Sequence, residues 1–172
     1  MQERISYKRN DIWPIVYDFF LRFKNQFPNI KCNIVGSIRR EKQEIHDFDI
    51  IIASKEEKIK EWCYERINCK RFSSPLFPYS FDMIQGELEN IKTQIWFCVP
   101  EEYGPHLLLK TGPLTFNLTL ASIAKNKGLT LSEHGLFRGT PENRGERIDE
   151  NTEANIIWLL LGCKWIHPKD RY

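Results

Sequence analysis

The sequence predicts an α+β fold in two lobes. The segment 11–27 carries apolar residues at helical spacing, which is typical of an amphipathic helix. The run 48–53 is almost wholly apolar, as in a strand that is buried on both faces. Near 103–104 a pattern of strands and acidic residues gives way to helices and turns. These observations divide the chain into lobes at 1–103 and 104–172.

The remaining elements follow in order along the chain. In the first helix Asp11 can serve as the cap and Pro14 falls in the first turn. The first lobe then continues with a strand at 31–35, a surface helix at 55–67, and strands at 80–84 and 92–99. The second lobe holds a helix that Pro113 opens and 127–128 closes, short strands at 129–131 and 136–138, a polar loop at 142–151, and a helix at 152–161.

The composition is that of a globular protein. The 172 residues are 41% hydrophobic, and 25 Lys and Arg stand against 23 Asp and Glu. This balance excludes disordered and collagen-like chains, and it restricts any nucleic-acid site to a local patch. No apolar run reaches the roughly 20 residues that cross a bilayer, and the N-terminus has no signal-peptide core. The five cysteines are scattered without a zinc-ligand spacing, so we expect reduced thiols and a cytoplasmic location.

One short segment combines a phosphate-binding turn with a pair of acids. Gly36 and Ser37 follow a predicted strand, where free backbone N–H groups and a hydroxyl can bind a phosphate oxygen, and Arg40 can add a charge-assisted hydrogen bond. Asp47 and Asp49 are two residues apart at the start of the next strand, so their side chains project from one face and can hold divalent cations. Each feature alone is common in turns and strand ends. Together they predict phosphoryl or nucleotidyl transfer, which needs both.

With these motifs the chain resembles the family X DNA polymerases of the nucleotidyltransferase superfamily. The stretches 111–117 (Thr-Gly-Pro-Leu-Thr-Phe-Asn), 131–137 and 161–171 are similar to further segments of that family, so the resemblance covers nearly the whole chain. It implies a nucleotidyltransferase-type palm at 1–103, a mixed sheet with helices on one face. It also implies a small nucleotide-binding α/β lobe, the fingers or thumb, at 104–172. The resemblance is to the minimal two-lobe members, such as those of viruses, without the lyase and helix-hairpin-helix domains.

The resemblance also implies a set of site residues. Asp47 and Asp49 would be catalytic and would bind two Mg²⁺ or Mn²⁺ ions. The residues expected at the nucleotide are Gly36, Ser37, Arg40, His46, Lys110, Gly112, Asn117 and His134. A basic patch in the second lobe is expected to contact DNA phosphates, and it consists of Lys125, Lys127, Arg138, Arg144 and Arg147.

The third carboxylate of the family should lie on the strand before Pro100. Counting back from that proline in the family's spacing reaches Ile95, and the polar neighbour Gln94 is expected to face the other way. An arginine that commonly contacts the template is replaced by Ala121. A carboxylate from an adjacent strand, at Asp82, Glu87 or Glu89, is the alternative source.

Three hypotheses about function follow. The first is a monomeric, repair-type DNA polymerase that adds deoxynucleotides to a primer in gapped or primer–template DNA, with no membrane partner. The second is a degenerate member that binds nucleotide or DNA with little chemistry, because an isoleucine replaces the third acid. The third is a nucleotidyltransferase on a non-DNA acceptor, which the family-like second lobe disfavours.

Overall fold

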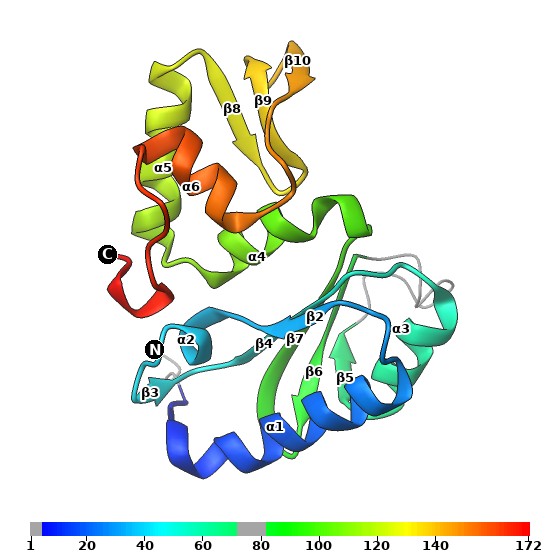
Figure 1. Ribbon diagram of the computed structural model, residues 1–172. Coiled ribbons are helices and arrows are strands. Elements are labelled where there is room, and N and C mark those ends of the chain that lie inside the picture. The colour runs from blue at the N-terminus through cyan, green and yellow to red at the C-terminus, as the bar shows by residue number, and fades with distance from the viewer. Residues whose placement is uncertain (1–4, 72–81) are drawn as a thin grey trace.

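The computed structural model describes residues 5–71 and 82–172 and has a larger N-terminal lobe and a smaller C-terminal lobe (Figure 1). The N-terminal lobe is built on a five-stranded sheet with the order β2-β4-β7-β6-β5. Its strands are β2 (Cys32–Ile34), β4 (Phe48–Ile52), β5 (Asn68–Arg71), β6 (Met83–Leu88) and β7 (Ile91–Phe97). β4 and β7 are parallel and the other neighbours are antiparallel, so the predicted mixed sheet is confirmed.

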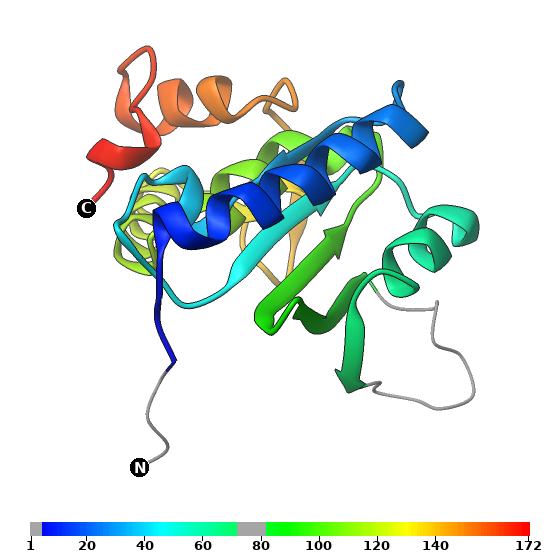
Figure 2. The same ribbon diagram turned by 90° about the horizontal axis from the view of Figure 1, so that it is seen from below.

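Two helices, α1 (Arg9–Gln26) and α3 (Glu57–Tyr64), lie on one face of this sheet (Figures 1 and 2). The predicted first helix is confirmed, because α1 buries an apolar stripe at helical spacing: Ile12, Val16, Phe19 and Phe23. It begins two residues earlier than expected, so Asp11 lies in the first turn and is not the cap, and Pro14 lies inside the helix. The helix predicted at 55–67 is shorter than expected and ends at Tyr64.

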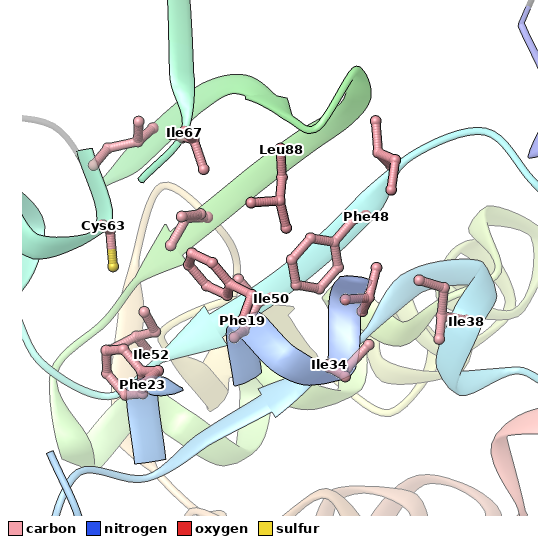
Figure 3. Close-up of a cluster of buried hydrophobic side chains, with 14 of the residues drawn as sticks. Phe19, Phe23, Ile34, Ile38, Phe48, Ile50, Ile52, Cys63, Ile67 and Leu88 are labelled. Atoms are coloured by element: carbon pink, nitrogen blue, oxygen red, sulfur yellow. The ribbon is translucent and has the colours of Figure 1, made fainter. Parts of the chain in front are cut away.

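The core of the N-terminal lobe lies between α1, α3 and the sheet (Figure 3). Phe19 of α1 meets Phe48 of β4 edge-to-face, with ring centroids 5.8 Å apart. Ile50 and Ile52 continue along β4 on the same face and are fully buried. Since side chains alternate along a strand, the residues between them point to the opposite face. This alternation directs Asp49 away from the apolar core.

The opposite face of the sheet is bounded by α2 and α4. The short helix α2 (Gly36–Arg39) follows β2, and a small sheet of β1 (Tyr7–Lys8) and β3 (Glu44–Ile45) flanks it. After the 3-10 turn η1 (Pro100–Glu102), α4 (Tyr103–Thr111) contacts β4 and α2 on one side and α6 and β9 of the C-terminal lobe on the other. The helix α4 therefore joins the two lobes (Figure 1).

The C-terminal lobe packs two helices against a three-stranded antiparallel sheet. Its elements are α5 (Leu114–Asn126), β8 (Leu129–Ser132), β9 (Gly135–Gly139), β10 (Arg144–Arg147), α6 (Glu153–Leu161) and η2 (Pro168–Asp170). A second apolar cluster, separate from the first, includes Leu108, Leu120, Leu136 and Ile156. Thr152 caps α6 by accepting a hydrogen bond from the Asn155 backbone N–H at 3.1 Å.

The predicted helix at 152–161, the hairpin and the helix after Pro113 all form, whereas the loop predicted at 142–151 contains the strand β10. The helix α4, the strands β1, β3, β5 and β10, and the 3-10 turns η1 and η2 were not predicted. β5 and β10 have four residues each and are polar, so no period-two pattern marks them. Of the strand predicted at 80–84, residues 80 and 81 lie outside the described part of the chain, and β6 begins at Met83.

Candidate active site

The acid pair lies at the start of β4, on the face of the sheet opposite α1. Burial raises the pKa of the Asp49 carboxyl to about 7, and the negative charge of Asp47 also raises it. Arg40, a hydrogen bond from Trp96 and the charge of Lys110 act in the other direction. Ionisation of Asp49 in the folded protein therefore costs free energy, because the carboxyl is buried and lies beside the second carboxylate of Asp47. Such a pair favours a cation that can neutralise both charges.

The turn between β2 and α2 is packed directly against Asp49. Gly36 has φ of +62°, and a Cβ built on it would lie 2.3 Å from Asp49 Oδ2. The backbone N–H of Val35 also donates to the Asp49 carbonyl oxygen at 2.8 Å. Glycine is required at this position both by the backbone conformation and by the space that the carboxylate occupies. The predicted Gly-Ser turn and the predicted acid pair are thus in contact.

Two polar groups of this turn are buried without a hydrogen-bond partner among the described residues. They are the Ser37 hydroxyl oxygen and the Arg40 Nε. Buried polar groups in native proteins are nearly always satisfied, so an unpaired donor beside a carboxylate pair indicates a missing ligand. A phosphate oxygen would satisfy both groups.

The α4–α5 connection completes the other side of the site. Arg40 Nη1 donates to the Thr111 carbonyl oxygen. The next residue, Gly112, has no side chain, and a Cβ added to it would lie 3.4 Å from the same Arg40 nitrogen. Asn117 donates to the Leu109 carbonyl at 2.7 Å, while its Oδ1 is buried and unpaired within the described chain. Gly112 therefore lies beside the Arg40 guanidinium, and Asn117 has an acceptor available.

Lys110 links the N-terminal lobe to the C-terminal lobe. Its ammonium lies 3.5 Å from the centroid of the Trp96 ring and 3.3 Å from Glu133 Oε2. Trp96 in turn hydrogen-bonds to Asp49, so the acid pair and the β8–β9 turn are connected through two side chains. The sequence analysis did not identify this connection.

The two histidines expected at the nucleotide have other partners. His134 Nδ1 is 2.8 Å from Glu102 Oε1, across the junction between the lobes. His46 Nδ1 is 3.1 Å from the Ile5 carbonyl oxygen. Both side chains remain partly accessible, so their expected contacts with nucleotide stay predictions.

The position predicted for the third carboxylate is wrong by one residue. Ile95 is fully buried in the apolar core and pairs with Ile50, while Gln94 pairs with Asp49 in the parallel β4–β7 ladder. Paired residues of neighbouring strands share a face, so Gln94 of β7 is on the same face as Asp49 and Ile95 is not. Counting from Pro100 placed the wrong member of an alternating pair at the site.

No carboxylate from the adjacent strand takes that place in the described structure. Glu87 pairs with Lys92, two ladder positions away from Gln94 and one strand further from Asp49. Asp82 is 2.9 Å from Lys55 Nζ. Within residues 5–71 and 82–172 no group of three or more Asp, Glu, His or Cys side chains is arranged to hold a metal ion. The partner of Asp49 on β7 is therefore the amide of Gln94 and not a third carboxylate.

The basic residues predicted to contact DNA differ in whether their charged groups are free to reach a phosphate. Lys125 lines a hollow of about 420 Å³ between α5, β8 and the β9–β10 connection, and Arg138 is exposed on β9. The Lys127 ammonium donates to the carbonyls of Leu159 and Leu160 at 3.0 and 2.9 Å, at the C-terminal end of α6. Lys125 and Arg138 are thus accessible, whereas Lys127 already has backbone partners.

A buried ion network between the lobes was not predicted. Glu153 of α6 accepts from Arg39 of α2 and from Arg171 near the C-terminus. The three residues are 114 and 18 positions apart, a separation that gives no local sequence signal. Arg39 thus turns toward the C-terminal lobe while the adjacent Arg40 faces the acid pair.

The mixed sheet, the Gly-Ser turn and the paired acids define a nucleotidyltransferase fold of the polymerase β type. Comparison with known proteins agrees with this class, because the DNA polymerase beta thumb model matches residues 106–172. The repair DNA polymerase X of African swine fever virus is 26% identical over 108 residues, covering 60% of this chain and 62% of the viral protein. DNA polymerase lambda of Rattus norvegicus is 25% identical over 176 residues, covering 84% of this chain and 29% of the rat protein. These similarities confirm that the chain is related to the family X DNA polymerases.

The matched region has limits that bear on function. The chain spans about 62% of the length of the viral relatives that it matches. In the described part of the chain no helix combines the length and apolarity that crossing a membrane requires.

Proposed function

We propose that this chain is a repair-type DNA polymerase that adds deoxynucleotides to a DNA primer. The observation that carries the proposal is the pair of unsatisfied buried groups, Ser37 Oγ and Arg40 Nε, next to Asp47 and Asp49. A triphosphate complexed to a divalent cation would satisfy all four side chains at once. Similarity to family X polymerases supports DNA as the acceptor.

The residues present fit Mg²⁺ or Mn²⁺. Two carboxylates suit a hard divalent ion that completes its coordination with phosphate oxygens and water. A cation bound there would neutralise charge on the triphosphate. Ser37 and Arg40 would hold the phosphates, and Gly36 would keep the backbone close to Asp49. Asn117 would offer its free Oδ1 to the nucleotide.

The two lobes would have separate roles. We propose the palm at 1–103 and a nucleotide- and DNA-binding lobe at 104–172, with Lys125 and Arg138 toward the DNA. The two distinct apolar clusters and the start of the thumb match at residue 106 support this division. Lys110 and His134 belong to the junction between the lobes, where a nucleotide would compete with Glu133 and Glu102 for them.

A second candidate function is a nucleotide- or DNA-binding protein with little catalytic activity. Gln94 favours it, because a neutral amide replaces a carboxylate at the side of Asp49. Polymerase activity would then be weak, although the phosphate cradle would be intact.

Primer extension separates the two candidates. Purified protein is incubated with a labelled primer–template, four deoxynucleoside triphosphates, and Mg²⁺ or Mn²⁺. We expect metal-dependent extension that Asp49→Asn abolishes and Ser37→Ala slows. Nucleotide binding without extension would favour the binding protein. Extension of an RNA or protein acceptor in preference to DNA would contradict both candidates.

A further inference from the structure

The third position of the candidate metal site is occupied by an amide. Asp49 and Gln94 are partners in the parallel β4–β7 ladder, and both are half-buried on the face that carries the acid pair. The next pair, Ile50 and Ile95, is fully buried in the apolar core. The register therefore makes Gln94 the ladder partner of Asp49 on the face of the acid pair, with Trp96 on the same face two residues further along β7.

The charge at this site suits one divalent ion. Asp47 and Asp49 supply two negative charges, and the positive charges of Arg40 and Lys110 already act on Asp49. Two divalent ions in a shared site stand only about 3.5 to 4 Å apart and repel each other strongly. A third carboxylate would offset that repulsion, whereas an amide oxygen brings a dipole and no charge.

Neighbouring strands do not supply the missing charge. The residue that pairs with Gln94 on the other side is Gln85 of β6, a second neutral amide. The described residues contain no cluster of three acidic, His or Cys side chains suited to a metal. The two carboxylates at the site consequently suffice for one divalent cation, and the negative charge for a second cation is lacking.

We propose that this site binds a single divalent cation together with the nucleotide, where the resemblance implies two, and that Gln94 sets this number. The inference rests on the proposed function, because it concerns the same nucleotide site. Nucleotide binding then needs only the ion between Asp47, Asp49 and the phosphates. The primer hydroxyl would lack a second cation to activate it, which makes the chain a slow polymerase.

Counting bound Mn²⁺ tests this inference without measuring activity. Protein and a non-hydrolysable α,β-imido deoxynucleoside triphosphate are mixed in equal amounts, and the free Mn²⁺ is followed by its EPR signal. Equilibrium dialysis of the same samples measures the bound nucleotide. We expect one Mn²⁺ per complex for the wild type and two for Gln94→Asp. Gln85→Asp is the matched control, since it places the same acid one strand further from Asp49, and it should stay at one ion.

Each other result has a definite meaning. Two ions on the wild type would overturn the inference and leave the proposed function standing. A folded Gln94→Asp variant that still binds one ion would overturn the role of Gln94. Wild-type protein that retains no nucleotide in dialysis would overturn the proposed function itself. A third carboxylate could destabilise the metal-free protein, so circular dichroism is recorded first, and Gln94→Glu, which keeps the length of the side chain, provides the second variant.

Discussion

Arg39 and Glu153 form a two-point ion pair across the junction of the lobes, with Nη1–Oε1 and Nη2–Oε2 both 2.8 Å. Arg171 adds a third bond to Glu153 Oε1 at 2.8 Å, and Thr111 Oγ1 accepts from Arg39 at 2.6 Å. Burial would raise the pKa of the Glu153 carboxyl, but the bonds from the two arginines outweigh it and hold the pKa below its usual value. The segment around Arg171, α6 and α2 are thus held together next to the Gly36–Ser37 turn.

Breaking this network should be costly. Glu153→Ala leaves two guanidinium groups without their carboxylate in a buried place, so we expect a loss of roughly 3 to 5 kcal/mol in the free energy of unfolding. Urea denaturation measures it, and Glu150→Ala, an exposed acid in the segment before α6, is the control. A loss below about 1 kcal/mol would show that the network is solvated in solution.

The sequence predicts the acid pair because its signal is local. An apolar strand fixes the alternation at 48–53, and two acids two residues apart must then share a face. Gln94 was missed although it lies on an equally clear strand. A face assignment by counting from Pro100 is reversed by a shift of one residue, and only the β4–β7 register resolves it. The Arg39–Glu153 pair depends on packing between lobes, which local patterns do not encode.

Gly36→Ala should destabilise the protein more than an ordinary glycine substitution does. The new Cβ would lie 2.3 Å from Asp49 Oδ2, and the backbone has φ of +62°. We expect a loss of roughly 2 to 4 kcal/mol, from backbone strain together with displacement of the carboxylate. Gly128→Ala is matched in backbone, with φ of +70° and nothing within 4 Å of the added Cβ.

That control should cost only about 1 kcal/mol. Chemical denaturation of both variants in the absence of metal gives the comparison. Equal losses in the free energy of unfolding for the two variants would mean that the Asp49 side chain moves aside at no cost. Glycine at position 36 would then be needed only for its backbone conformation.

Asp49→Asn should stabilise the metal-free protein at alkaline pH. The folded-state pKa of Asp49 is about 7, above its usual value of 3.8, so the native state holds more protons than the unfolded chain between these values. The contribution of this group to the free energy of unfolding therefore falls as the pH rises from about 4 to 7, and the cost is complete above that range. Asparagine does not ionise and should gain on the order of 4 kcal/mol over the wild type at pH 8, with little difference at pH 4.

Thermal or urea unfolding in EDTA across this pH range tests the shift. Asp47→Asn should give a smaller gain, because the charge of Asp47 contributes to the raised pKa of Asp49 but burial contributes more. Parallel pH profiles for the wild type and Asp49→Asn would rule out a perturbed carboxyl.

DNA binding should be weak, independent of sequence and sensitive to salt, because the net charge is only +2 and the accessible basic residues are local. With roughly 3 to 5 phosphates neutralised, the slope of log affinity against log salt should be about −3 to −4.5 for duplex DNA. Lys125→Ala and Arg138→Ala should each reduce the magnitude of that slope by about 1. Lys127→Ala is the contrasting variant, since its ammonium binds the Leu159 and Leu160 carbonyls, and it should lower stability by about 1 kcal/mol with little change in slope. Fluorescence anisotropy at several salt concentrations gives the slopes. A larger effect of Lys127→Ala than of Lys125→Ala on the slope would contradict the proposed location, and would indicate that DNA binds near the end of α6 and not at the hollow between α5 and β8.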